Sequence, residues 1–378
     1  MASEGIPVNK EIVAWARKRA GLTIEDATQK FPHIAAWEAG EALPTYPQLE
    51  KLADELKLPI AAFFFPEPPT LPPIRESFRT LPDTEFDQIP RQVRFLLRKA
   101  KALQLNLSEL TQGRNPSARL ITRDLRFRDT RSIARMAAQV RDYLGVSLSD
   151  QYRWPDDETA LKAWRDTLHA AGVFVFKDAF RVEGYSGFSL YDNEFPIIYV
   201  NNSATKTRQI FTLFHELAHL LFHTSGIDTI EDRYITRLPE QQRRIEILCN
   251  QFAAEFLVPD TVFSDAMADR DHSEQTASQL AQRYHVSREV IYRKFLDRGW
   301  IDQAEYARAA DEWAAQKTGG SGGNWYYTQI IYLGRDYINL AFRQYHQNRI
   351  DDAQLAEYLD TKPRNIGTLE EYFLQGSQ

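Results

Sequence analysis

The sequence predicts a mainly α-helical protein with a small β-sheet, and three observations support this fold class. Apolar residues recur at helical spacing over most of the chain, whereas runs rich in β-branched and aromatic residues are few and short. The clearest of these runs are GVFVF at 172–176 and FPIIYV at 195–200. Two linkers, PEPPTLPPI at 66–74 and TGGSGGN at 318–324, separate helical segments from the part that holds the strands.

The composition is that of a globular protein. The chain has 378 residues, of which 43% are hydrophobic and 26% charged, so it can bury a large core without covalent cross-links. A single cysteine, Cys249, excludes an intrachain disulfide and a cysteine-based zinc finger. The N-terminus lacks the pattern of a signal peptide, and no apolar run approaches the roughly 18 residues of a membrane span. We therefore expect a cytoplasmic protein.

Residues 8–65 predict a bundle of short helices, with Gly40 ending one and Thr23 and Asp26 capping another. Within it, AAWEAGEALPTYPQLEKLADELKLP resembles the second half of a Cro/repressor-type helix-turn-helix domain. About three positions are missing before Trp37, where such a domain has its turn and the start of its recognition helix. The segment also holds 7 Lys+Arg against 8 Asp+Glu. We therefore expect it to dock a protein or to dimerise rather than to read a DNA sequence.

Charge is unevenly distributed along the chain. The net charge is −6, yet residues 91–141, within a helical stretch at about 85–145, hold 13 Lys+Arg and 3 Asp+Glu. Such a stretch either offers a surface to nucleic acid or an acidic partner, or is a solvated face whose charges pair with acidic groups elsewhere. The second interpretation is the simpler one, so any binding of DNA is expected to be weak or non-specific.

Further elements are predicted after the basic stretch. The two runs named above form strands, GYSGFSLYD at 184–192 can form another, and helices are expected at 203–223 and 239–257. QLAQRYHVSREVI at 279–291 and QLAEYLDTKPRNI at 354–366 both look like helix-turn-helix hairpins. Ordinary helical hairpins account for the same pattern, and we favour that interpretation.

Two histidines and a glutamate lie in an otherwise apolar helix, FTLFHELAHLLFH at 211–223. His215 and His219 are four residues apart, so a helix places both imidazoles on one face, about 6 Å apart along its axis, where they can bind one ion. Glu216 projects to the side and can hold a metal-bound water. Burial of polar side chains costs free energy unless something satisfies them, so this H-E-x-x-H spacing, typical of zinc proteases, predicts zinc.

A third metal ligand is expected from the next helix, RIEILCNQFAAEFLVP. His223 is eight residues from His215, about 12 Å along the axis, so one ion cannot reach both. Glu246 shares a stripe with small residues that can press against the H-E-x-x-H helix, whereas Glu255 points elsewhere. Weaker alternatives lie in a connection without rigid support: Asp228, Glu231 and Asp232.

The two helices together resemble the ImmA/IrrE family of bacterial metallopeptidases. FTLFHELAHLLFH, followed by E-x-x-C-N-x-F-A-A-E-F-L-V-P, is similar to that family's H-E-x-x-H helix and its E-x-x-A-N-x-F-A-A-x-L-L-x-P segment, with Cys249 where alanine is usual. Carried over by position, the resemblance implies that His215, His219 and Glu246 bind zinc and that Glu216 is the general base. The stretch GYSGFSLYDNEFPIIYVNNS and the order of the parts also look like the family.

The resemblance divides the chain into four parts. These are a shortened repressor-like domain at 1–70, a proline-rich linker with a basic helical segment at 71–145, a zincin-like α+β peptidase domain at 146–317, and a glycine-rich joint with a helical domain at 318–378. In the peptidase part, FPIIYV is expected to be an edge strand that flanks the cleft and can pair with an extended substrate.

The resemblance implies a zinc-dependent endopeptidase that cleaves a specific protein partner. That partner would be a repressor or an antitoxin, in a stress response, a mobile element or toxin–antitoxin regulation. The alternative is a DNA-binding transcriptional regulator or antitoxin that keeps the peptidase fold as a scaffold. The intact Glu216 favours the enzyme, because a scaffold would not need it. Three tyrosines are candidates for stabilising the oxyanion, and the sequence does not choose among them: Tyr185, Tyr199 and Tyr234.

Overall fold

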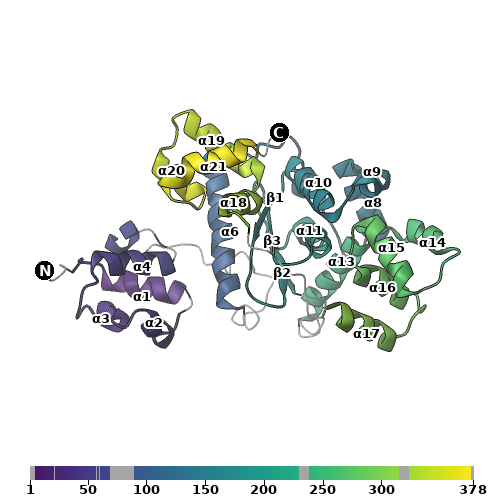
Figure 1. The fold of residues 1–378 in the computed structure, drawn as a ribbon, viewed down its shortest axis with the longest axis horizontal. Helices are drawn as coiled ribbons and strands as arrows, with labels where there is room; N and C mark the ends of the chain where they lie inside the picture. Colours follow the sequence, from purple (N-terminus) through teal and green to yellow (C-terminus); the bar gives the residue numbers. More distant parts are fainter. Residues whose placement is uncertain are drawn as a thin grey trace. The chain divides into compact units, whose positions relative to one another are not determined.

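The computed structural model describes residues 5–20, 22–56, 58, 60–68, 89–229, 238–314 and 323–375. These residues are mainly helical with one small sheet, which confirms the predicted fold class (Figure 1). The chain separates into two compact units, 1–76 with 88–97 and 77–87 with 98–378. None of the described helices is long and apolar enough to cross a membrane.

The first unit is a bundle of short helices in its described part. Its elements are α1 (Lys10–Arg19), α2 (Ile24–Lys30), α3 (Ile34–Ala39), α4 (Tyr46–Leu56) and the 3-10 helix η1 (Ile60–Phe64). Thr23 and Asp26 form the predicted capping box of α2, and Gly40 ends α3 in the left-handed conformation. Because α3 has only six residues, its buried Trp37 lies close to the helix start, as the shortened sequence suggests.

The second unit holds a four-stranded sheet in the order β1-β3-β2-β4. The strands are β1 (Phe174–Asp178), β2 (Tyr185–Leu190), β3 (Ile197–Asn201) and β4 (Ile227–Thr229). β1 is parallel to β3, whereas β2 is antiparallel to both β3 and β4. Strands were predicted at the first three places. The expectation that FPIIYV forms an edge strand is wrong, because β3 pairs on both sides and the described edges are β1 and β4.

Further helices connect the strands or follow them in the described part of the chain. They are α6 (Arg91–Leu110), α7 (Ile121–Asp124), α8 (Ile133–Leu144), α9 (Leu148–Arg153), α10 (Asp157–Ala170), α11 (Lys206–Leu221), α13 (Glu240–Leu257), α14 (Asp260–Met267), α15 (Glu274–Tyr284), α16 (Arg288–Asp297), α17 (Gln303–Ala314), α18 (Trp325–Leu333), α19 (Arg335–His346), α20 (Asp352–Tyr358), the 3-10 helix η3 (Pro363–Asn365) and α21 (Ile366–Gln375).

The two faces of the sheet are covered by different helices. Because successive side chains of a strand point to opposite faces of the sheet, Val175 and Ile198 point into the core that also contains residues of α10 and α11. Phe176 and Tyr199 point to the other face, where the Phe176 ring meets the ring of Tyr337 on α19 at 5.3 Å between centroids. The helix with the H-E-x-x-H motif therefore lies on one face only.

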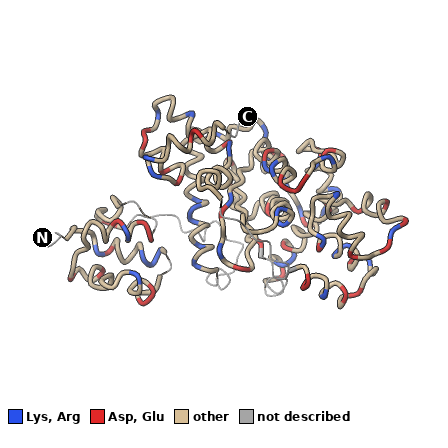
Figure 2. The backbone as a smooth tube through the Cα atoms, in the orientation of Figure 1, with Lys and Arg blue, Asp and Glu red and all other residues tan. Residues whose placement is uncertain are grey.

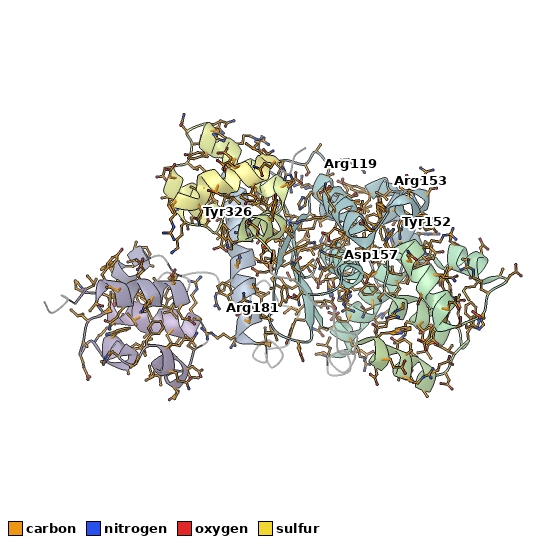
Figure 3. All side chains as sticks on the ribbon, in the orientation of Figure 1. Arg119, Tyr152, Arg153, Asp157, Arg181 and Tyr326 are labelled. Carbon is orange, nitrogen blue, oxygen red and sulfur yellow. The ribbon has the colours of Figure 1, made fainter. Side chains whose placement is uncertain are left out.

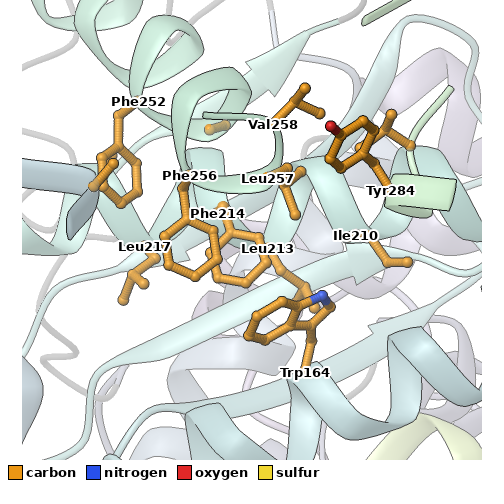
Figure 4. Close-up of a cluster of buried hydrophobic side chains, with 14 of the residues drawn as sticks. Trp164, Ile210, Leu213, Phe214, Leu217, Phe252, Phe256, Leu257, Val258 and Tyr284 are labelled. Carbon is orange, nitrogen blue, oxygen red and sulfur yellow. The ribbon is translucent and has the colours of Figure 1, made fainter. Parts of the chain in front are cut away.

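Aromatic packing fixes α11 between its neighbours. Phe214 of α11 lies 4.9 Å from the Trp164 ring of α10 and 4.1 Å from the Phe256 ring of α13, measured between ring centroids (Figure 4). All three side chains are at most 1% exposed. This contact sets the positions of α11 and α13 relative to each other.

The hairpin of α15 and α16 supports the ordinary helical interpretation. Its second helix is the one that would enter a DNA groove, but its basic side chains have partners within the unit. Arg288 lies over the Trp313 ring of α17, and Lys294 binds Asp260 at 2.6 Å. The hydroxyl of Tyr292 donates a hydrogen bond to Glu305 of α17. Because α17 packs against α16, this face of the hairpin is part of the fold.

Candidate metal centre

Three buried side chains from two packed helices converge in the second unit. His215 and His219 lie on α11 with their Nε2 atoms 3.2 Å apart. Glu246 of α13 places Oε2 3.3 Å from Nε2 of His215 and Oε1 3.2 Å from Nε2 of His219. The structure therefore brings together the three residues that the sequence suggests as metal ligands.

The spacing of these atoms fits a tetrahedral metal ion. Ligand atoms about 2.0–2.1 Å from zinc, at tetrahedral angles, lie about 3.3 Å from one another. The three observed separations match that edge length, and the three residues are at most 8% exposed. Two histidines and one carboxylate are a known donor set of catalytic zinc sites, which keep a fourth position for water.

Charge at the cluster also favours a cation. Burial opposes a positive charge on His215, but the carboxylates of Asp228 and Glu246 outweigh this effect and raise its pKa to about 9. Burial would favour the neutral form of Glu246, yet His219 and His215 hold its pKa well below the usual range. A buried carboxylate in contact with two imidazoles is therefore stabilised as an anion, the form that binds a metal.

Neighbouring polar groups orient both imidazoles. The amide oxygen of Asn250 can only accept, so Nδ1–H of His215 donates to it at 3.0 Å. The Thr224 hydroxyl donates to the carbonyl oxygen of His219 at 3.1 Å and accepts from its Nδ1–H at 3.4 Å. Each Nδ1 therefore carries a hydrogen, and Nε2 is the ring atom that faces the cluster. This is the arrangement that metal-binding histidines use once Nε2 has lost its proton.

Gly226 presses its backbone against the ring of His219. A Cβ atom at this position would lie 2.4–2.7 Å from three atoms of the imidazole. The amide of Ser189 on β2 donates to the carbonyl oxygen of Gly226 at 3.0 Å and holds the segment in place. The glycine is therefore required by close approach, because any side chain would push the imidazole out of position.

Asp228 joins the edge strand β4 to the first half of α11. Its carboxylate is 3% exposed and accepts hydrogen bonds from Arg208 at 3.1 and 3.2 Å and from the Thr212 hydroxyl at 2.9 Å. Arg208 also donates to the Ser186 hydroxyl at 2.9 Å. This network fixes the first half of α11 against β2 and β4.

Glu216 lies next to the cluster without a partner. Its side chain is fully buried, and neither carboxylate oxygen has a hydrogen bond of normal geometry within the described part of the chain. The Ser189 hydroxyl is a nearby donor that weakly favours the charged form of this carboxylate and lowers its pKa. Burial raises its pKa to about 7, against the opposing effect of His219 and His215. A buried acceptor without a donor is costly, so this carboxylate fits a role in binding a further group such as a water.

The described residues that were alternative metal ligands make other contacts in the structure. His223 follows α11, where its Nε2 lies 3.1 Å from the Thr122 carbonyl oxygen and its ring stacks on Tyr191. Glu255 accepts the amide of Asp260 at the start of α14. Asp228 binds Arg208 as described. The remaining two alternatives, Glu231 and Asp232, lie outside the described residues.

The three candidate tyrosines have different positions. Tyr199 cannot face the cluster, because it lies on the sheet face opposite to α11, with its hydroxyl 3.4 Å from Asp178 and its ring stacked on Phe188. Tyr185 is half-buried at the start of β2 and pairs with Thr229 of β4. Tyr234 lies outside the described residues.

The residues that orient the ligands were not predicted from the sequence. Asn250 lies in the small-residue stripe beside Glu246, and its place in the motif was a signal that its amide has a role. Asp228 lies in a strand of three residues, too short for a periodic pattern, and Gly226 directly precedes this strand. Their roles depend on contacts with α11 that local sequence does not encode.

Comparison with known proteins finds a similarity in the region that contains the cluster. Residues 169–296 match the family model of the IrrE N-terminal-like domain, which includes all four strands and both helices of the cluster. A 99-residue stretch is 35% identical to the radiation response metalloprotease IrrE of Deinococcus radiodurans, over 26% of this chain and 30% of the relative.

A second relative gives the same result. The radiation response metalloprotease IrrE of Deinococcus deserti is 34% identical over 99 residues, covering 26% of this chain and 34% of the relative. The chain thus matches about a third of the length of these curated relatives. The matches support the ImmA/IrrE resemblance for the part that contains the cluster, and the first unit lies outside the matched region.

Gly226→Ala is expected to weaken metal binding by roughly tenfold or more, because the new methyl group would displace the imidazole of His219. Competition with a chromogenic chelator measures the affinity. Gly367→Ala is the matched control, since a Cβ there meets nothing within 4 Å. Equal metal affinity in the two variants would show that the backbone contact at Gly226 does not position His219.

Proposed function

We propose that the chain is a zinc-dependent endopeptidase. The observation on which this rests is the convergence of His215, His219 and Glu246 beside the buried, unpartnered carboxylate of Glu216. Two imidazoles and one carboxylate would hold the zinc ion. When bound, zinc polarises the scissile carbonyl group and lowers the pKa of water in this site. The similarity to IrrE metalloproteases supports the same activity.

The protein's own residues supply proton transfer and orientation. Glu216 takes the proton of the attacking water and passes it to the leaving amine nitrogen. Its lack of a competing hydrogen bond leaves both oxygens available for this role. Asn250 and Thr224 keep the two imidazoles in the tautomer that leaves Nε2 free. Tyr185 and Tyr234 are the proposed candidates for stabilising the oxyanion. Tyr199 is excluded from this role because it lies on the other face of the sheet.

The proposed substrate is a protein, a repressor or an antitoxin whose gene lies near that of this chain. This assignment rests on the family resemblance, as does the link to stress response, mobile elements or toxin–antitoxin regulation. We further propose that the first unit is a shortened repressor-like domain that docks a protein partner. A transcriptional regulator with a peptidase scaffold is the alternative, and it would not need a free carboxylate at Glu216.

Glu216→Gln is expected to keep the fold and the metal but to reduce cleavage of the repressor by roughly 100-fold or more, as for other general bases. The glutamine has the same shape but cannot take a proton from water. Cleavage is followed by gel electrophoresis alongside metal analysis of the same sample. A variant that cuts at the parent rate would exclude this role for Glu216.

Glu246→Ala is expected to lose most of the bound zinc, because it removes one of the three ligands. Metal analysis of the purified protein measures the occupancy. Glu240→Ala is the control on the same helix, since that side chain is 83% exposed and pairs only at the surface with Arg243. Full occupancy and unchanged affinity in the Glu246 variant would rule out Glu246 as a ligand.

The first unit is expected not to read a DNA sequence. Base recognition needs side chains near the start of a helix that enters the major groove, and α3 has six residues with no side-chain cap at His33. Binding to the DNA upstream of the gene and to a scrambled duplex is compared at low and near-physiological salt. A preference of about 100-fold for the upstream DNA, lost when residues 1–70 are deleted, would favour the regulator instead.

A further inference from the structure

The cations of the basic segment 91–141 divide into two groups. One group has partners, for example Lys99 with Asp178 at 3.0 Å and Arg123 with Glu194 at 2.6 Å. The segment thus follows in part the simpler interpretation of its charge, and Figure 2 shows its positive residues along α6. The other group is exposed and has no ion pair with any described carboxylate, and four of its members lie close together in the sequence: Arg126, Arg128, Arg131 and Arg135.

These four arginines share one stretch of surface, called here the arginine rim. Arg126 and Arg128 flank the buried Phe127, and both are exposed to solvent. A turn closed by the amide of Arg131 and the carbonyl oxygen of Arg128 brings these two residues close. Arg135 follows one turn later, in the first turn of α8.

The arginine rim is fixed to both helices of the metal cluster. The amide of Phe127 donates to the carbonyl oxygen of Leu221 at the end of α11. The Phe127 ring lies 5.4 Å from that of Phe222 and 5.0 Å from that of Phe252 on α13, between centroids. Asp129 pairs with Arg244 of α13 at 3.5 Å, two residues before Glu246. The segment that carries the rim is therefore packed on the C-terminal end of α11 and on α13.

We infer that the arginine rim binds an acidic segment of the protein substrate. This inference rests on the proposed peptidase function and adds a charge requirement to its substrate. Four exposed guanidinium groups repel one another, and carboxylates relieve this repulsion while accepting paired hydrogen bonds from each fork. Because Phe127 and Asp129 attach the rim to both metal-binding helices, a substrate segment bound at the rim is held on the same helices that carry the cluster.

Nucleic acid fits the arginine rim less well. A duplex presents phosphates over a long surface, and its binding gains from many adjacent cations. Here Asp124 and Asp129 stand among the arginines, Glu194 lies beside them at Arg123, and the chain as a whole has a net charge of −6. A short acidic peptide segment, in contrast, can be bound by the four arginines of the rim without further cations.

The test measures binding rather than cleavage, so it does not depend on turnover. The full chain with Glu216→Gln is titrated with a labelled glutamate-rich peptide, with the same peptide carrying glutamine, and with a DNA duplex. We expect the glutamate peptide to bind about tenfold more tightly than the glutamine peptide at low salt, with a smaller difference near 0.15 M salt. Loss of catalysis in other experiments would leave this result unchanged.

Two double variants, each of which removes two positive charges, show whether the glutamate peptide binds at the arginine rim. Arg128→Gln with Arg135→Gln is expected to weaken binding of the glutamate peptide roughly fivefold. The control, Arg153→Gln with Arg308→Gln, removes exposed arginines of α9 and α17 and is expected to change it less than about twofold. Arg153 is labelled in Figure 3. Thermal unfolding and metal content verify that both variants fold.

Three results would overturn the inference. The first is equal binding of the glutamate and glutamine peptides. The second is an equal loss in both double variants, which would mean that only net charge matters. The third is tighter binding of the DNA duplex than of the glutamate peptide, with the loss confined to the rim variant, which would assign the surface to nucleic acid.

Discussion

The contact between α11 and α13 is the constraint on which the site depends. Small side chains at Ala218, Cys249 and Ala253 are fully buried between them and allow a close approach. Phe214 and Phe256 stack at one end and fix how far each helix can slide. A cluster with edges of 3.2–3.3 Å tolerates little movement, because a shift of about 1 Å would separate the ligand atoms of the two helices. The apolar contact between α11 and α13 thus fixes the positions of the two helices, and these positions determine where the ligand atoms of the cluster lie.

Burying so many polar groups is costly, and the structure limits this cost by giving nearly all of them partners. Asn250 and Thr224 satisfy the outer nitrogens of the imidazoles, while Arg208 and Thr212 satisfy Asp228. Glu216 is the exception among the acidic groups of the cluster. A structural carboxylate in this place would be expected to have a donor. Glu216 has only the Ser189 hydroxyl as a nearby donor, without a bond of normal geometry, and this favours a chemical role over a packing role.

The parts of the site that the sequence predicted are those set by spacing within one helix. The four-residue interval of His215 and His219 fixes their common face, and the small-residue stripe selects Glu246 over Glu255. The fold class followed in the same way from local periodicity. The errors concern strand order and sheet face, which long-range packing decides. FPIIYV forms a central strand because β1 and β2 both pair with it, and this order leaves Tyr199 facing away from α11.

The opposite edge of the sheet explains why helices far along the sequence belong to the same unit. β1 is an edge strand, and its Val175 has no strand partner on the outer side. His169 accepts the Val175 amide at 2.9 Å, and Arg165 donates to the Val175 carbonyl oxygen. Arg165 donates in addition to the carbonyl oxygen of Ile331, near the end of α18.

His169 completes this link, because its other nitrogen donates to Asp336 of α19 at 2.6 Å. Protonation of the imidazole would place a hydrogen on the nitrogen that accepts the Val175 amide, so the neutral form is the one that fits. Burial lowers its pKa and acts in the same direction. Side chains of α10 thus replace a neighbouring strand at β1 and tie the C-terminal helices to the sheet. Because α10 also packs on α11 through Trp164, the same helix links this edge to the metal cluster.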